Sequence, residues 1–337
     1  MPAKKSKGKI RCAMIGYGGA FNMGRAHGNW INQTPGMETV AVCDVDRARL
    51  KVAKQELPGV QTYPSVAALL KKADFDLGVI ILPHNMHAPV ALQLLKAKKH
   101  VVLEKPFCIT VAEADAMIAA AKASKVMLSV FHNRRWDGDF MTILDIIKRG
   151  LVGEVFHLEA WGGGYGHPGK WWRADKKISG GALYDWGAHF VDWILHVIPK
   201  KMVSITGFFH KRVWMDATNE DHVEAIVRFE GGEVANLQLS NIARAGKPRW
   251  HILGTKGAIV DQGGSFRVTT EVGGLPAELN VPYLKSRWDA YYPTIADHLL
   301  RGKRLAVTPE SARRVIEVIE FAELSSKAGK TLPVKYP

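Results

Sequence analysis

The chain has 337 residues, 47% of them hydrophobic, which is enough for two domains that each bury a core. No run approaches eighteen apolar residues, and the first residues, MPAKKSKGK, lack the apolar segment of a signal peptide, so we expect a soluble cytoplasmic protein with no membrane partner. The net charge of +14 would suit a nucleic-acid-binding protein, but four lysines lie in residues 1–9, a basic tail that we expect to be disordered, and the other charges are scattered. We therefore expect no nucleic-acid partner and interpret the charge as favouring solubility and anionic ligands.

The first part of the chain repeats a short apolar run, a turn and a segment of helical period. The predicted strands are 10–15, 39–43, 60–63, 77–82, 101–104 and 126–131. Helix starts lie between them, such as Ser65 ahead of an apolar stripe and Thr110 three residues before Glu113. Apolar strands without alternation, separated by helices, predict a doubly wound parallel sheet, an α/β domain over residues 10–133. Cys12, Cys43 and Cys108 fit neither a disulfide framework nor a zinc ribbon, so we expect small buried residues.

The first predicted strand runs into the glycine-rich stretch IGYGGAFNMGRAHGNW. Gly16 and Gly18 allow a tight turn in which backbone N–H groups could approach a pyrophosphate at the start of a helix. Phe21 stands where the usual third glycine would be, and Gly24 follows three residues later. A flexible turn would need no more than this, but the position after the first strand favours a dinucleotide site.

An acidic residue at the end of the second predicted strand supports the same interpretation. Asp44 lies twenty residues beyond Gly24, where a carboxylate can accept both ribose hydroxyls of an adenosine and would repel a 2′-phosphate. We therefore expect NAD rather than NADP, although Arg47 and Arg49 are near enough in sequence to weaken that preference.

The fifth predicted strand ends in an ion pair and a proline, in the sequence HVVLEKPFCIT. Lys105 falls just past the carboxyl end of this strand, in the crevice where a nicotinamide ring should lie. Pro106 turns the chain there and is a candidate for a cis bond. Taken alone, Glu104 and Lys105 could equally form a surface ion pair in a loop.

The second part of the chain mixes strands with a few helices and predicts an α+β domain over residues 134–337. Strands with two-residue alternation are predicted at 154–161, 202–209, 223–229, 234–239 and 250–253. Turn signals between them, such as Gly231 and Gly232, indicate hairpins and a mainly antiparallel sheet. A helix is predicted over 309–327, starting at a proline.

The stretch GGALYDWGAHFVDWILHVI predicts a helix with a polar and an apolar side. Projected at 100° per residue, Asp185, His189, Asp192 and His196 share a narrow arc opposite the apolar residues. A solvated helix face is the ordinary explanation, but the arc contains no Lys, Arg or Glu. We expect no metal, because a catalytic zinc would need a further histidine or cysteine in a recognisable motif.

The preceding loop, WGGGYGHPGKWWRADKKISGG, is rich in glycine and aromatic residues and could close over the crevice. Tyr165, Trp171 and Trp172 could stack on a sugar, with Arg173 and His167 donating hydrogen bonds. Packing of these tryptophans between domains would explain each of them as well.

Five segments together resemble the Gfo/Idh/MocA family of glucose–fructose and inositol-type oxidoreductases: IGYGGAFNMGRAH, AVCDVD, VIILPHNMHAPVALQLLKAKKHVVLEKPF, HNRRW and SGGALYDWGAHFVDW. The resemblance spans nearly the whole chain and implies an N-terminal Rossmann domain and a C-terminal α+β domain. Its large open sheet commonly forms the subunit interface, which implies a homodimer or homotetramer. Lys105, Asp185 and His189 match the family's catalytic residues. The lengthened glycine loop departs from the pattern and leaves the pyrophosphate contacts open.

The motifs and the resemblance together give two sets of candidate site residues. The expected contacts of NAD, or of NADP as the less favoured coenzyme, are Gly16, Gly18, Gly19, Ala20, Phe21, Asp44, Pro83, His84, His87, Glu104 and Lys105. The expected contacts of the substrate are Asn133, Arg134, Tyr165, Trp172, Arg173, Asp185 and His189.

The expected activity is hydride transfer between a nicotinamide coenzyme and a secondary alcohol of a sugar, a sugar acid or a cyclitol. His189 is the expected general base, Asp185 orients it or binds a neighbouring hydroxyl, and Lys105, held by Glu104, stabilises the developing alkoxide. Two other functions fit the same family: a glycoside hydrolase that retains NAD, and a dinucleotide-dependent regulator without catalysis.

Overall fold

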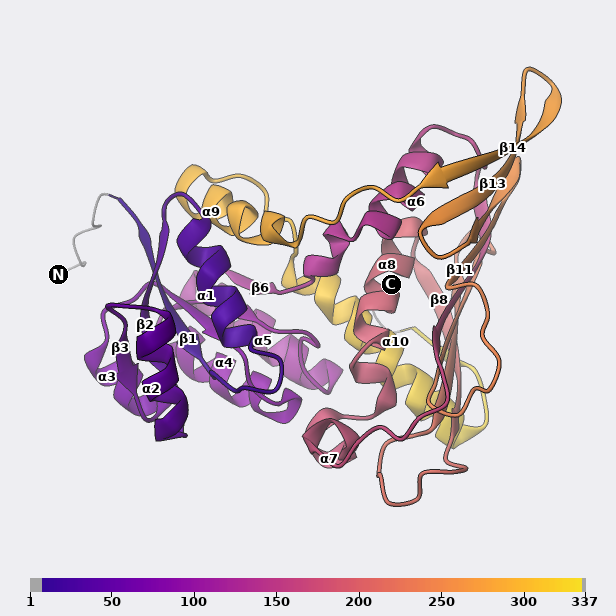
Figure 1. The fold of residues 1–337 in the computed structure, drawn as a ribbon. Coiled ribbons are helices and arrows are strands. Elements are labelled where there is room, and N and C mark those ends of the chain that lie inside the picture. Colours follow the sequence, from indigo (N-terminus) through magenta and orange to yellow (C-terminus); the bar gives the residue numbers. More distant parts are fainter. Residues whose placement is uncertain (1–7, 335–337) are drawn as a thin grey trace. The chain divides into compact units, whose positions relative to one another are not determined.

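The structure is a computed structural model that describes residues 8–334 (Figure 1). Most of the expected basic tail therefore lies outside the described residues. The chain forms two compact units: the first holds residues up to 108, 112–131 and 289–310, and the second holds 109–111, 132–288 and the residues from 311 onward. The sequence analysis assigned 289–310 to the second domain, whereas in the structure this segment packs in the first unit.

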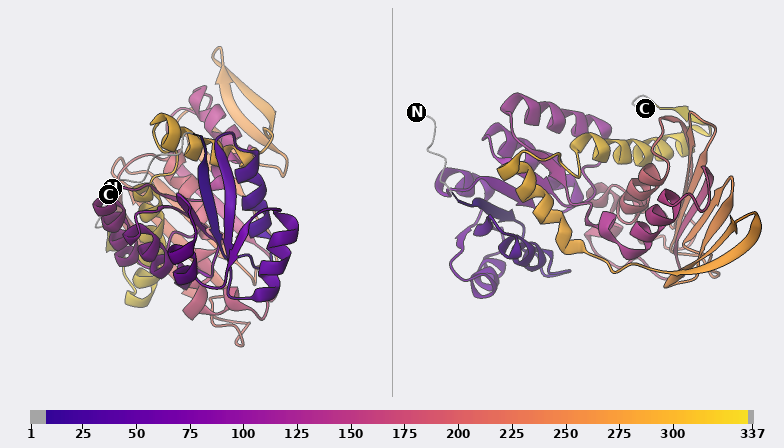
Figure 2. Two further views of the ribbon diagram at one scale, coloured as in Figure 1. Left: turned by 90° about the vertical axis from the view of Figure 1, so that its left-hand side faces the viewer. Right: turned by 90° about the horizontal axis from the view of Figure 1, so that it is seen from above.

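The first unit contains a six-stranded sheet in the order β3-β2-β1-β4-β5-β6, with every neighbouring pair parallel. Helices lie on both sides of it (Figure 2), so the predicted doubly wound domain is confirmed. The strands are β1 (Ile10–Ile15), β2 (Met37–Cys43), β3 (Gln61–Tyr63), β4 (Leu77–Ile80), β5 (His100–Leu103) and β6 (Leu128–Val130).

Side-chain caps help to start two of the helices in this unit. Ser65 accepts a hydrogen bond from the N–H of Ala68 at the start of α3, and Asp46 does the same for Ala48 at the start of α2. The helices are α1 (Met23–Gln33), α2 (Arg47–Glu56), α3 (Val66–Lys72), α4 (His87–Lys96), α5 (Val111–Ser124) and α9 (Tyr291–Arg301), with a 3-10 turn at His84–Met86.

The second unit contains a nine-stranded sheet in the order β14-β13-β12-β11-β7-β10-β9-β8-β15. Only β7 and β10 run parallel, so the predicted mainly antiparallel sheet is confirmed. The strands are β7 (Val155–Gly163), β8 (Met202–His210), β9 (His222–Phe229), β10 (Val234–Ser240), β11 (Trp250–Gly254), β12 (Gly257–Asp261), β13 (Ser265–Val272), β14 (Leu275–Pro282) and β15 (Leu332–Pro333). The sequence analysis missed β12 to β15.

Helices cover one face of this sheet, and no helix of the described residues covers the other (Figures 1 and 2). The covering helices are α6 (Gly138–Lys148), α8 (Gly187–Val197) and α10 (Pro309–Ala328), and a short helix, α7 (Lys176–Ser179), precedes α8. Alternate residues of the strands pack beneath them, as Val223, Ala225 and Val227 do on β9. The buried side chains of Trp193 on α8 and Trp250 on β11 join the helices to the sheet.

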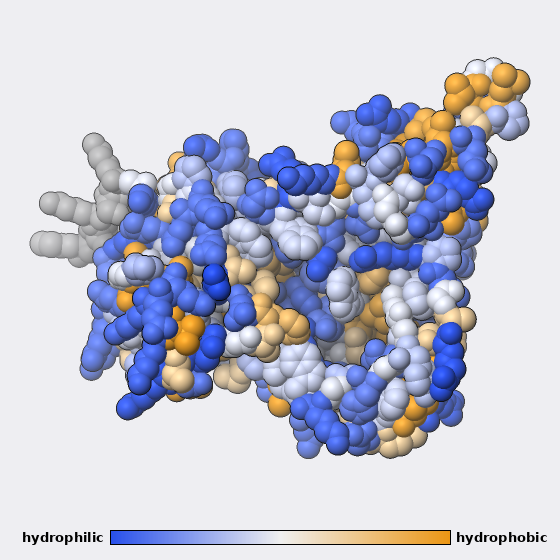
Figure 3. Space-filling model, viewed as in Figure 1, coloured by the Kyte–Doolittle hydropathy of each residue, from blue (hydrophilic) through white to orange (hydrophobic). Residues whose placement is uncertain are grey.

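The hairpin of β13 and β14 ends in an apolar tip (Figure 3). Val272 and Leu275 at this tip are 56% and 71% exposed.

The three cysteines are buried in their units, as expected. Across residues 8–334, no helix is both long and apolar enough to span a bilayer.

Candidate coenzyme and substrate sites

Two glycines of the loop between β1 and α1 are required by the packing around them. Gly16 has φ +99°, and a Cβ at this position would lie 2.0 Å from the carbonyl oxygen of Ile81. Gly24 lies in the first turn of α1, where a Cβ would lie 2.6 Å from the Tyr17 ring. Gly24 therefore takes the close-packing position of the missing third glycine, while a Cβ on Gly18 would meet nothing within 4 Å. The loop is longer than usual, but its two ends pack as a dinucleotide loop requires.

Asp44 is held beside this loop at the end of β2. Its carboxylate accepts hydrogen bonds from the backbone N–H of Tyr17 at 2.6 Å and of Asp46 at 2.9 Å. Arg49 donates to the carbonyl of Tyr17 at 2.7 Å, and its guanidinium lies against Gly19. The site therefore places a fixed carboxylate and a nearby cation next to the glycine loop, as the sequence predicted.

Glu104 anchors the chain at the end of β5. One carboxylate oxygen accepts the backbone N–H of Lys105 at 3.0 Å, and the other lies 3.0 Å from Nε2 of His27. The Nδ1 atom of His27 lies 2.6 Å from the hydroxyl of Tyr292 on α9. The Lys105–Pro106 bond is cis. Glu104 thus holds the backbone at Lys105, and the sequence analysis missed both His27, which binds Glu104, and Tyr292, which binds His27.

The protonation of this chain of contacts follows from its surroundings. Burial would raise the pKa of Glu104, but the hydrogen bond from His27 and the charge of Lys105 keep that pKa below its ordinary value. A carboxylate can only accept, so Nε2 of His27 carries the hydrogen. Burial raises the pKa of Tyr292 well above its ordinary value, so its hydroxyl stays protonated beside Nδ1. The fully buried His27 therefore links α9 to the end of β5 through its two ring nitrogens.

His87 contacts the backbone after β4 and after β5. It is fully buried, and its two ring nitrogens lie 2.8 Å and 2.9 Å from the carbonyl oxygens of Pro106 and Leu82. Burial lowers the pKa of His87, so the neutral ring donates to one carbonyl at a time. This position joins the loops after β4 and β5, and contact of His87 with the coenzyme stays a prediction. His84 is buried as well, and Pro83 immediately precedes it.

In the second unit, Asp185 does not lie on the predicted helix. The chain passes through Gly180 and Gly181, with φ of +90° and +134°, into a 3-10 turn at Ala182–Tyr184. Helix α8 begins only at Gly187, so the prediction that Asp185 and His189 share one helical face was wrong. Asp185 instead pairs with Arg173 from the aromatic loop.

His189 lies on α8 and is 4% exposed. Its ring stacks on Trp193 with centroids 6.1 Å apart, and the edges of Trp186 and His132 lie at 5.8 Å and 6.3 Å. One turn further along, Asp192 accepts two hydrogen bonds from the guanidinium of Arg135, at 2.8 Å and 2.6 Å. This buried pair fastens the helix that carries His189 to the segment after β6.

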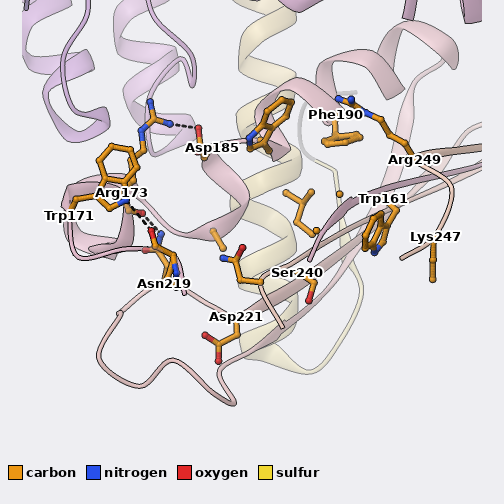
Figure 4. Close-up of a pocket in the computed structure, with 17 residues that line it drawn as sticks. Trp161, Trp171, Arg173, Asp185, Phe190, Asn219, Asp221, Ser240, Lys247 and Arg249 are labelled. Atoms are coloured by element: carbon orange, nitrogen blue, oxygen red, sulfur yellow. Dashed lines mark hydrogen bonds and ion pairs between the residues drawn. The ribbon is translucent and has the colours of Figure 1, made fainter. Parts of the chain in front are cut away.

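A cavity of about 540 Å³ lies within the second unit (Figure 4). This volume is in the range of small-molecule sites, ~300–1,000 Å³. The described residues that line it include aromatic, amide and charged side chains, among them Trp161, Trp171, Arg173, Asp185, Trp186, Phe190, Asn219, Asp221, Asn241, Lys247 and Arg249. Such a lining suits a ligand with apolar faces and many hydroxyl groups.

Two of the expected substrate contacts, Arg173 and Asp185, line this cavity. The others have different neighbours: the Tyr165 ring packs against Trp214 and lies under Arg244. For Trp172, Asn133, Arg134 and His189, contact with a substrate stays a prediction. Sequence reasoning missed Lys247 and Arg249, although the basic stretch RAGKPR between two predicted strands was a possible signal. Within the described residues, no cluster of three or more His, Cys, Asp or Glu side chains could hold a metal ion.

Family models match both units of the chain. Residues 10–132 match an oxidoreductase family with an NAD-binding Rossmann fold, and residues 140–260 match the GFO/IDH/MocA C-terminal domain. The chain belongs to the Gfo/Idh/MocA family of oxidoreductases. Its first unit is the NAD-binding domain, and the glycine loop, Asp44 and the Lys105 loop fit a dinucleotide.

Similar proteins cover nearly the full chain. The uncharacterized oxidoreductase YdgJ of Escherichia coli is 29% identical, and the match covers 96% of this chain and 98% of YdgJ. The scyllo-inositol 2-dehydrogenase (NADP(+)) IolW of Bacillus subtilis is 25% identical over 97% of this chain and 96% of IolW. The crystal structure of an NAD-binding protein from Listeria innocua has a TM-score of 0.85 at 26% identity and covers 96% of this chain and 97% of its own. A shorter match, 29% identical over 48% of this chain and 37% of the relative, is an alpha-N-acetylgalactosaminidase of Shewanella oneidensis.

The two glycines of the loop should respond differently to alanine. Gly16→Ala forces a side chain at φ +99° into the Ile81 carbonyl, so we expect strain of about 1–3 kcal/mol or more and a lower Tm. Gly18→Ala meets no protein atom within 4 Å, so its Tm should stay unchanged while NAD affinity falls. Thermal unfolding and calorimetric titration with NAD measure the two effects. Equal losses of Tm in both variants would contradict this division.

Removing the charge of Asp192 should destabilise the second unit. Burial would raise the pKa of Asp192, but the charge of Arg135 holds it well below its ordinary range. Asp192→Asn removes the carboxylate that accepts both hydrogen bonds from the buried guanidinium of Arg135, at a cost of about 3–5 kcal/mol. Because the pKa of Asp192 is lower in the folded protein than in the unfolded chain, its charge stabilises the fold at pH values above the unfolded pKa. The difference in stability between the wild type and Asp192→Asn should therefore persist above pH ~4 and shrink at lower pH. The control is Asp145→Asn, which breaks the exposed Arg149 pair and should change Tm little.

Proposed function

We propose that the protein is an NAD-dependent dehydrogenase that acts on a secondary alcohol of a sugar, a sugar acid or a cyclitol. The observation that carries this proposal is the anchored Glu104–Lys105 element at the end of β5, in the same unit as the dinucleotide loop. The carboxyl ends of parallel strands meet at one edge of the sheet, so an ammonium after β5 belongs to the edge at which a coenzyme binds. A module that only bound a dinucleotide would have no need of a lysine on this anchored backbone.

The reaction requires a proton to leave the hydroxyl as hydride leaves the same carbon, and NAD supplies the hydride acceptor. Of this chain's residues, His189 takes the proton, because an imidazole titrates near neutral pH. Lys105 stabilises the negative charge that develops on the oxygen. Asp185, already paired with Arg173 on the wall of the cavity, accepts a hydrogen bond from a neighbouring hydroxyl of the substrate. The backbone contact of Glu104 keeps the lysine loop in place during this step.

The polyol class is supported by the lining of the cavity and by the activity for which one relative is named. IolW is named an inositol dehydrogenase, and a cyclitol has the secondary alcohols that this chemistry needs. Hydrolysis with retained NAD is the alternative that the glycosidase relative suggests. Net accumulation of NADH with a polyol separates the two, because a hydrolase would return the hydride in every cycle.

We also propose that two copies of the chain pair through the uncovered face of the nine-stranded sheet, as a homodimer or within a homotetramer. This face carries charged, amide and apolar side chains side by side. Glu224 there accepts hydrogen bonds from Asn236 and Gln238, and Phe208 on the neighbouring strand is 44% exposed. An interface that mixes satisfied polar groups with exposed aromatic rings is typical of association between subunits.

Removal of either proposed catalytic side chain should abolish turnover without loss of the coenzyme. Lys105→Met should lower kcat about 10²–10³-fold, and His189→Ala about 10²–10⁴-fold. The measurement is reduced nicotinamide absorbance across a panel of polyols, sugars and sugar acids, with NAD binding followed by titration. Lys122→Met, on the exposed surface of α5, is the matched control. Near-normal kcat in either catalytic variant would contradict the assigned role.

Asp44 should determine the choice between NAD and NADP. The fixed carboxylate can accept the ribose hydroxyls and would repel a 2′-phosphate, so we expect kcat/KM to favour NAD. Asp44→Ala should lose about 10–100-fold with NAD and improve with NADP, because Arg49 lies beside the loop. Asp74→Asn, at an exposed carboxylate in the same unit, is the control. A wild-type preference for NADP, the coenzyme in the name of IolW, would overturn this prediction.

A further inference from the structure

We propose that the cavity of the second unit selects an anionic polyol, a sugar acid whose carboxylate is bound by Arg249 and Lys247. Both residues line the cavity, and both lie between β10 and β11, with Arg249 immediately before β11. The chemistry performed on the acid rests on the proposed function, whereas the binding preference rests on the cavity alone. Which cations of the cavity can bind a ligand depends on which of the charges around it are already neutralised.

The two carboxylates that line the cavity are each compensated by the protein. Asp185 pairs with Arg173 (Figure 4), so these two charges cancel each other. Asp221 is bound by Lys211 at 2.8 Å and by the backbone N–H groups of Arg212 and Val213, both at 2.6 Å. Burial would raise the pKa of Asp221, but these donors hold it at about 2. Neither carboxylate is therefore available to neutralise a further cation.

Arg249 keeps a positive charge at the cavity wall. Its guanidinium lies over the rings of Phe190, Trp193 and Trp186, at 5.1 Å, 5.2 Å and 5.7 Å from their centroids. These rings hold the planar group in place from one side while leaving its N–H donors unused.

The one carboxylate near Arg249 compensates it only weakly. Asp139 lies 3.7 Å from Nε of Arg249, beyond hydrogen-bond distance, and already accepts a hydrogen bond from Trp250. Nε is buried and makes no hydrogen bond to any residue within 8–334. A guanidinium that is fixed by aromatic rings and lacks hydrogen-bond acceptors is prepared to bind a planar carboxylate through two N–H groups.

Lys247 adds a second charge of the same sign. Its ammonium donates to the side-chain oxygen of Gln238 at 2.7 Å, a neutral partner, and no carboxylate within the described part of the chain lies in ion-pair range. The neighbouring walls are those that a sugar needs: Trp161 and Trp171 present aromatic faces, and Asn241 can bind hydroxyl groups. A carboxylate on a polyhydroxylated ring would satisfy both kinds of surface at once.

Binding to the protein loaded with NADH, which cannot accept a hydride, tests this proposal without turnover. Calorimetry compares D-glucuronate with D-glucose and D-galacturonate with D-galactose, pairs that differ only in the carboxylate. We expect each acid to bind at least about tenfold more tightly than its neutral partner, with the ratio falling as salt rises. A ratio near one in the wild-type protein would overturn the proposal. A glucose phosphate that bound far more tightly than the uronates would overturn the sugar-acid class.

Variants assign the preference to the two cations. Arg249→Gln should remove most of the acid-to-neutral ratio, Arg249→Lys should keep part of it, and Lys247→Gln should lower it independently. Arg149→Gln, at an arginine immediately after α6 whose side chain is 67% exposed, is the matched control and should leave the ratio intact. If Arg249→Gln does not fold, the Lys247→Gln and Arg249→Lys ratios decide the matter. Unchanged ratios in every folded variant would overturn the assignment.

Turnover separates this inference from the proposed function. If the uronates bind as expected but no NADH forms with any polyol or acid, the dehydrogenase proposal fails and the cavity preference stands. If NADH forms with the same kcat/KM for acids and their neutral partners, the dehydrogenase proposal stands and the cavity preference fails. Higher kcat/KM for the acids, lost in Arg249→Gln through KM, supports both.

Discussion

A carboxylate at the end of a buried strand must be compensated, and the compensation of Glu104 organises the first unit. Its partners come from the backbone of Lys105 and from His27, and His27 in turn binds Tyr292. These contacts join α1, α9 and the end of β5 at one point. Leaving a buried charge without them would cost several kcal/mol. The lysine loop therefore has a fixed position because the acid beside it has to be satisfied.

The same constraint explains why residues 289–310 return to the first unit. Tyr291 and Tyr292 are buried there against the ring of Phe131. The hydroxyl of Tyr291 lies 2.8 Å from Oγ of Ser129, which itself donates to the carbonyl of Val307. Since Ser129 uses its only hydrogen on Val307, Tyr291 is the donor to Ser129. The segment thus adds two tyrosine hydroxyl groups to the buried hydrogen bonds of the first unit.

Sequence reasoning succeeded where the signal was local and failed where it depended on distant partners. The parallel sheet, the glycine loop and Asp44 follow from runs of a few residues, and the structure has them as expected. The helix around Asp185 was extended too far, because a 100° projection does not register that Gly180 and Gly181 adopt positive φ. Strand β14 was missed because Pro276 and Pro282 interrupt its run, and proline within a run argues against a strand. The role of His27 could not be read at all, since its two partners are 77 and 265 residues away.

The catalytic residues and the substrate class differ in the same way, because the first depend on local motifs and the second on residues that are distant in the sequence. Catalytic groups follow from motifs, because the chemistry needs a particular residue at a strand end or a helix start. In our proposal the substrate class depends on the cavity of the second unit, whose wall joins Trp161 on β7 to Asp185 before α8 and Arg249 before β11. A count of charges in the sequence gives +14 and cannot say which of them face a ligand. Only the pairing of each carboxylate with its own donors reveals that the cations left over at this cavity are Arg249 and Lys247. The net charge of the chain therefore says little about the substrate. What matters is which individual cations at the cavity are not fully compensated by a carboxylate of the protein.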